Sequence, residues 1–180
     1  MQRPFRRLWS SPKRSRIVVV VPGRPGAGEN VVVAKMSRFN PVELALFLRA
    51  LPLARRAQRV RAVPIHIVVE DLCHRGGGLT AFPVDRLARA ADRASDRWHA
   101  WFGGLNTCLV RSLVLGSLLA GRGEVVLNLG FRPGDQAEPD LAGHAWVTVG
   151  GQPVGGDGQL AETRYTRVLE IPYCAPRKAS

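Results

Sequence analysis

Three residues in the second half of the chain could act together in nucleophilic catalysis. They are a cysteine, Cys108, a histidine, His144, and an acid, Asp157, in that order along the chain. A thiol paired with an imidazole base can attack a carbonyl group and form a covalent intermediate. A carboxylate can orient the imidazole and stabilise its charged form. The order of these residue types therefore predicts a Cys-His-Asp triad.

The residues around Cys108 predict that it lies in the first turn of a helix. Two glycines are followed by a capping residue and a long apolar stretch, which ends at residues 121–123. Backbone N–H groups at a helix N-terminus are unpaired and the helix dipole is positive there, so both favour a thiolate and can stabilise an oxyanion. We expect Asn106, Trp98 and Trp146 to contribute to the oxyanion site or to the wall of the cleft.

The residues around His144 predict an antiparallel sheet. Residues 124–130 and 144–149 have the character of strands, separated by a polar loop at 132–140. Two glycines then turn the chain into a short strand at 152–154, which is a strong hairpin signal. His144 begins its strand, where a side chain can reach the mouth of a cleft. The acid follows just beyond the hairpin.

The first half of the chain reads as a tail followed by helices. Residues 1–16 are basic and without acids, which predicts a disordered tail, and residues 17–34 read as a hairpin around a glycine-rich loop that lacks the known phosphate-binding patterns. Asn40 is a good helix cap, and we expect that helix to break near Pro52. An arginine-rich amphipathic stretch at 53–63 and a helix at 83–101 follow.

The composition limits the class of protein. The 180 residues suffice for one domain with a short additional segment, and no apolar run reaches the length of a membrane span. The net charge of +12 suggests an acidic partner, but no nucleic-acid-binding signature accompanies it, so we favour neither a nucleic acid nor a membrane as partner. The basic start lacks a signal-peptide pattern, which predicts a cytoplasmic protein.

The three cysteines do not predict a disulfide framework or a metal site. Their number is odd, no export signal accompanies them, and none forms a CxxC pair. We therefore interpret Cys73 and Cys174 as buried structural thiols and leave Cys108 as the reactive one. We expect no metal.

Several short motifs together resemble one family. They are TCLVRSL at 107–113, GFR at 130–132, GHAWV at 143–147 and GQPV at 151–154. From about residue 98 to 173 the chain resembles the transglutaminase-like leader peptidases of lasso-peptide biosynthesis. The arginine-rich region at 40–72 is similar in style to the segment that those proteins place ahead of the core.

The resemblance implies an α+β fold with a papain/transglutaminase-like core, in which a helix bearing Cys108 packs on an antiparallel sheet, preceded by a helical region. We expect a basic tail and hairpin at 1–39, a helical region at 40–82 and a peptidase core at 83–180. It implies removal of the leader from a ribosomally made precursor peptide through a thioester, without a cofactor. The implied partners are the leader region of the precursor, a small leader-recognition protein and the macrolactam-forming cyclase.

Two alternatives remain open from the residues themselves. The same nucleophile and base could transfer the acyl group to an amine instead of water. In the other alternative, Cys108 is inert and the chain is a basic module that binds peptides or nucleic acid, which predicts salt-sensitive binding.

Overall fold

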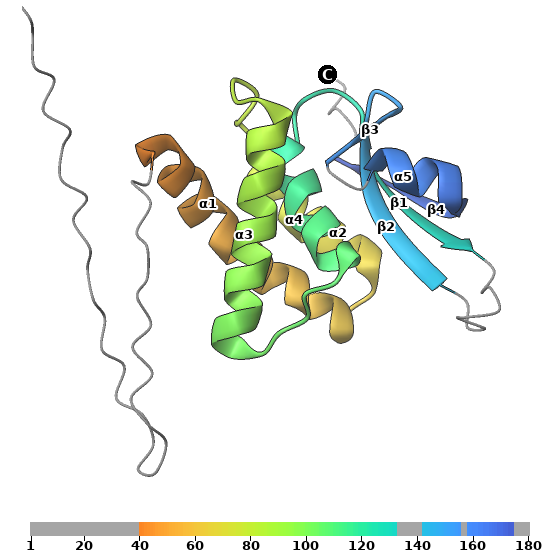
Figure 1. Ribbon diagram of the computed structural model, residues 1–180, viewed down its shortest axis with the longest axis horizontal. Helices are drawn as coiled ribbons and strands as arrows, with labels where there is room; N and C mark the ends of the chain where they lie inside the picture. Colours follow the sequence, from red (N-terminus) through yellow and green to blue (C-terminus); the bar gives the residue numbers. More distant parts are fainter. Residues whose placement is uncertain (1–39, 133–141, 156–157, 175–180) are drawn as a thin grey trace, which may run out of the picture. The chain divides into compact units, whose positions relative to one another are not determined.

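The chain folds into a helical half followed by a mostly β half, as the computed structural model shows (Figure 1). The structure describes residues 40–132, 142–155 and 158–174. The tail and hairpin expected within 1–39, and Asp157, lie outside these residues. The elements are α1 (Pro41–Ala57), a 3-10 turn η1 (Gln58–Arg61), α2 (Ile65–Gly76), α3 (Val84–Phe102), α4 (Cys108–Leu119), β1 (Val125–Arg132), β2 (Ala142–Val149), β3 (Gln152–Val154), α5 (Gly158–Arg164) and β4 (Thr166–Tyr173).

The four strands form one antiparallel sheet in the order β3-β2-β1-β4. β1 lies in the interior of the sheet, where Gly130 pairs with His144 of β2. β3 pairs only with the second half of β2, at residues 147–149. Within the described residues, the half of β2 that carries His144 therefore has a strand partner on one side only.

One apolar core joins the helices to the sheet. α4 is buried along almost its whole length, because its sequence is apolar on all sides. It packs against α1, α2 and α3 and against β1 and β2. Figure 1 shows α2 and α4 between the sheet and α1. The regions expected at 40–82 and 83–180 thus share this core. The expected α+β class is confirmed, with a cysteine-bearing helix packed on an antiparallel sheet.

Close backbone contacts fix how α4 meets its neighbours. Gly116 faces the ring of Tyr173, and a Cβ at this position would overlap that ring. The Tyr173 hydroxyl donates to the Leu113 carbonyl at 2.9 Å. Burial raises the pKa of Tyr173, so its phenol stays neutral and continues to donate. The end of β4 is therefore held against the middle of α4.

The expected helix break near Pro52 is wrong. α1 runs through Pro52 to Ala57. Proline removes one helical hydrogen bond, but Pro52 is exposed, so the carbonyl that loses its donor can be solvated. Leu53, Ala54 and Ala57 are buried against the core, and this burial holds the helix together beyond the proline.

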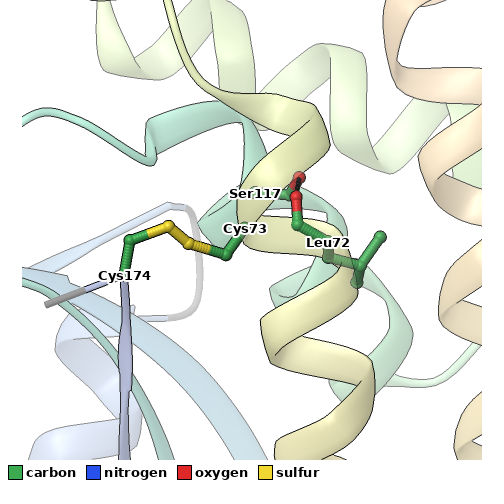
Figure 2. The surroundings of a disulfide bond; sticks show 4 residues. All are labelled: Leu72, Cys73, Ser117 and Cys174. Atoms are coloured by element: carbon green, nitrogen blue, oxygen red, sulfur yellow. Dashed lines mark hydrogen bonds between the residues drawn. A yellow bond between two sulfur atoms is a disulfide. The ribbon is translucent and has the colours of Figure 1, made fainter.

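The interpretation of Cys73 and Cys174 as separate thiols is also wrong, because they form a disulfide (Figure 2). Their Cα atoms are 5.8 Å apart, within the range that a disulfide spans. The bond joins the last turn of α2 to the residue after β4. The two positions are 101 residues apart in sequence, so their proximity arises only from the tertiary packing of α2 against β4.

In the described ranges, no helix has both the length and the apolar character required to cross a bilayer.

Candidate active site

Cys108 is the first residue of α4, as expected, and it carries the free thiol of the chain. Thr107 is the N-cap, with extended backbone angles, and its hydroxyl accepts from the Val110 N–H at 3.4 Å. The Arg111 N–H bonds to the Thr107 carbonyl at 3.1 Å. The N–H groups of Cys108 and Leu109 therefore have no acceptor within the helix. Half-buried Cys108 thus lies at the helix end whose N–H groups are unpaired within the helix.

The loop before Cys108 is held by side chains from two helices. Gln58 clamps Leu105 at both ends of its amide: it accepts from the Leu105 N–H at 2.6 Å and donates to the Leu105 carbonyl at 2.8 Å. His99 Nδ1 contacts the Gly104 carbonyl. Gly103 has φ 64°, in the left-handed region, and ends α3. The loop that leads into α4 is therefore held by η1 through Gln58 and by α3 through His99.

Asn106 lies in a polar cluster beside this loop. Its amide donates to Asp96 Oδ1 at 2.9 Å, and its carbonyl oxygen accepts from Arg111 Nε at 3.1 Å. Arg111 also binds Asp96 at 2.8 Å. The side chain that we expected at the oxyanion site is thus engaged in tying α4 to α3.

A buried hydrogen bond connects the helix of Cys108 to the strand of His144. Ser112 Oγ donates to the Ala145 carbonyl at 2.9 Å. Ser112 follows Cys108 by one helical turn on the same face, and Ala145 is adjacent to His144. This bond sets the separation between the nucleophile-bearing helix and the start of β2.

Cys108 and His144 line the same pocket. Residues from α3, α4, β2 and the β3–α5 connection form its wall, and Asp92, Arg111 and Trp146 are among them. His144 is half-buried, and its ring lies beside that of Trp146 on one face of β2. The lining of the pocket therefore includes a cysteine at a helix start, a histidine and charged residues of both signs.

Trp146 forms a buried floor beside His144. The two side chains lie on one face of β2, with ring centroids 6.4 Å apart and nearly parallel planes. The indole fits over Gly130 of β1, where a Cβ would come within 2.8 Å of it. Its Nε1 is buried with no hydrogen-bond partner in the part of the chain that the structure describes.

Of the residues expected at the site, the structure brings Cys108, His144 and Trp146 together in one pocket. Trp98 and Asn106 are not part of its lining. Trp98 packs against Phe102 with ring centroids 4.3 Å apart and tilted planes, and it lies next to Gly104 in the loop that leads to Cys108. Asp157 lies outside the described residues, and its role as the orienting acid stays a prediction.

Two contacts near His144 were not expected from the sequence. One is the hydrogen bond that Ser112 donates to the Ala145 carbonyl. The sequence indicated it only through the presence of a polar residue one turn after Cys108 in an apolar helix. The other is Tyr165, whose ring stacks on the His144 imidazole at 5.0 Å. No sequence pattern indicated Tyr165, because the stacking depends on how α5 folds back on the sheet.

Comparison with known proteins agrees with this arrangement. Residues 47–170 match the family model of the transglutaminase-like superfamily. A search of curated proteins and a search of solved structures each found no significant match. The matched range contains α4 with its cysteine, the strand with its histidine and most of the sheet. The chain belongs to the transglutaminase-like superfamily.

Proposed function

We propose that this protein is a cysteine peptidase that removes the leader from a ribosomally made precursor peptide, with Cys108 as nucleophile and His144 as base. The observation that carries the proposal is the shared pocket of the thiol and the imidazole, at the start of a capped helix and of a strand. Membership in the transglutaminase-like superfamily supports a cysteine-dependent reaction on a carbonyl group.

The chemistry follows from these two side chains. His144 takes the proton of the Cys108 thiol, and the thiolate attacks the carbonyl carbon of the amide between leader and core. The N–H groups at the start of α4 stabilise the resulting oxyanion. The C–N bond then breaks as His144 protonates the leaving amine, so the core is released and the leader remains on Cys108 as a thioester. His144 activates water, which hydrolyses the thioester and releases the leader.

Asp157, Trp146, Asn106 and Trp98 have supporting roles in this proposal. Asp157 orients His144 from beyond the β3 hairpin. Trp146 lines the pocket, Trp98 supports the loop that leads to Cys108, and Asn106 holds the approach to α4 through Asp96. Because Asp157 acts only through the base, we predict that Asp157→Asn reduces activity less than Cys108→Ala or His144→Ala. An Asp157→Asn enzyme as inactive as Cys108→Ala would contradict this order.

The precursor as substrate rests on the resemblance of the motifs around Cys108 and His144. We propose that a small leader-recognition protein presents the leader and that a macrolactam-forming cyclase consumes the released core, in the cytoplasm. Genes for a short precursor, such a recognition protein and an asparagine-synthetase-like cyclase beside this gene would support this assignment.

The test is cleavage of the cognate precursor, followed by mass spectrometry of the products. We expect the wild type to give separate leader and core masses, and Cys108→Ala and Cys108→Ser to leave the precursor intact. Ser117→Ala is the control, because it removes a hydroxyl from the same helix away from the pocket. Equal cleavage by wild type and Cys108→Ala would refute the proposal.

The same site could also transfer the acyl group to an amine, since attack and thioester formation are identical. The product distinguishes the two reactions. Hydrolysis leaves a free carboxylate on the leader, whereas transfer gives a new amide bond and the mass of the attached amine.

A further inference from the structure

The imidazole of His144 has an aromatic neighbour from a different element of the fold. Tyr165 follows α5, and its ring lies 5.0 Å from the His144 ring at an angle of 24°. Such stacked geometry is favourable for two π-systems beyond the area that they bury. Tyr165 and Trp146, the latter on the same strand as His144, are thus both ring neighbours of the imidazole, with ring planes that are close to parallel to it.

Tyr165 itself is held in place by the short helix that precedes it. Its N–H bonds to the Ala161 carbonyl at 3.0 Å, continuing the helical pattern by one residue. Ala161 is buried, and α5 packs on β2 and β3. The position of the ring is thus set by the docking of α5 on the face of the sheet that carries His144.

Charged groups surround this stack from several elements. The Arg132 guanidinium at the end of β1 lies over the Tyr165 ring at 5.8 Å, and that of Arg167 in β4 lies over Trp146 at 6.0 Å. Asp92 of α3 and Arg111 of α4 line the pocket with Cys108 and His144. Cations that rest on the faces of aromatic rings hold those rings in a defined orientation. The rings therefore form an anchored frame around the imidazole.

An imidazole on a strand can turn about its Cβ–Cγ bond, because that torsion has a broad energy profile. A base must keep its nitrogen within hydrogen-bond reach of the proton that it takes. A parallel ring against the imidazole restricts this rotation without using either nitrogen.

We propose that Tyr165 is a positioning residue for His144, holding the plane of the imidazole by ring stacking so that a nitrogen faces Cys108. This inference rests on the proposed function, in which His144 is the base of Cys108. It assigns the role to the aromatic ring of Tyr165 and none to its hydroxyl.

Tyr165→Phe and Tyr165→Leu separate the ring from the hydroxyl. The reaction of Cys108 with iodoacetamide is followed on the full-length chain from pH 5 to pH 9, and leader cleavage is measured beside it. We expect Tyr165→Phe to stay within about twofold of the wild type, because its ring stacks equally well. We expect Tyr165→Leu to slow alkylation at neutral pH by about two- to tenfold, the range that ring stacking contributes.

The pH profile distinguishes positioning from general damage. At pH 9 a free thiol ionises without a base, so the rates of Tyr165→Leu and wild type should converge there. In leader cleavage, kcat should fall by a similar factor with little change in KM, because the base acts on the bound substrate. Thermal melting confirms folding, and Tyr165→Gln replaces Tyr165→Leu if the latter does not fold.

His144→Ala separates failure of this inference from failure of the proposed function. If His144→Ala slows alkylation at neutral pH but Tyr165→Leu has the wild-type profile, the role of Tyr165 is wrong and the proposed base stands. A Tyr165→Phe variant as slow as Tyr165→Leu would also overturn the role of the ring. If His144→Ala itself has the wild-type profile, the proposed function fails.

Discussion

Loss of the hydrogen bond from Ser112 to the Ala145 carbonyl should lower the rate of leader cleavage by more than its small contribution to the unfolding free energy suggests. This bond is buried, 2.9 Å long, and joins α4 one turn after Cys108 to the residue next to His144. Ser112→Ala removes this buried hydrogen bond, which costs about 1–2 kcal/mol of unfolding free energy. It also frees the start of β2 from α4, on the side where β2 has no strand partner among the described residues.

The chain offers a matched control on the same helix. Ser117 Oγ donates to the Leu72 carbonyl at 2.7 Å, and this serine is fully buried (Figure 2). Ser117→Ala should therefore lower the unfolding free energy by a similar amount, about 1–2 kcal/mol. The bond joins α4 to α2, away from the pocket, so Ser117→Ala should leave the reaction of Cys108 within about twofold of wild type.

The two variants are compared by urea unfolding and by the rate of leader cleavage. Displacement of a reacting group by a fraction of an ångström costs large factors in rate, so we expect Ser112→Ala to lower kcat/KM by about tenfold or more. Iodoacetamide alkylation of Cys108 at neutral pH should slow in the same variant. Equal rates in Ser112→Ala and Ser117→Ala, at equal loss of stability, would refute the claim that this bond sets the distance between nucleophile and base.

Three further predictions concern stability. Gly116→Ala places a methyl group into the ring of Tyr173 and should lower the unfolding free energy by about 1–3 kcal/mol in urea unfolding, with a loss near zero contradicting the packing. Asp71→Asn removes a carboxyl whose pKa is lowered chiefly by Arg75 of α2 and also by Arg56 of α1. In unfolding curves at several pH values, the wild type should be more stable than this variant by about 1 kcal/mol at neutral pH, and the difference should disappear as pH falls below 3.8. Cys174→Ser opens the link to Cys73, which encloses about 100 residues, and should lower the unfolding free energy by about 2–5 kcal/mol under oxidising conditions and much less with a reductant present.

The sign of the Asp71 prediction follows from the direction of the shift. A carboxyl whose pKa is lowered in the folded state binds its proton at a lower pH in the folded protein than in the unfolded chain. Its ion pairs therefore contribute fully above the unfolded value and are lost as pH falls through the folded value. The pairs are partly exposed, so their contribution is small.

The local sequence around the nucleophile and base was sufficient to predict their elements. Two glycines and a capping residue before an apolar stretch predicted that Cys108 lies in the first turn of a helix, and it is the first residue of α4. The glycine turn at 150–151 located the β2–β3 hairpin, with His144 near the start of β2. These signals are local in sequence, and local conformational propensity is sufficient to locate a helix start or a hairpin turn.

Features that depend on tertiary contact were missed or wrong. Pro52 stays within α1 because residues that follow it are buried against the core. The tendency of proline to break a helix does not take this tertiary burial into account. The partners Cys73 and Cys174 are far apart in sequence and meet through the packing of α2 on β4. Tyr165 contacts His144 only because α5 docks on the sheet. None of these follows from spacing along the chain.

The most direct test of the central claim is the covalent intermediate on Cys108. The enzyme is mixed with its precursor, quenched in acid within the first turnover and measured as an intact protein by mass spectrometry. We predict an adduct with the mass of the acylated leader, located on Cys108, removed by hydroxylamine and absent in Cys108→Ala. Leader removal by the wild type without such an adduct, and at the same rate in Cys108→Ala, would contradict the account.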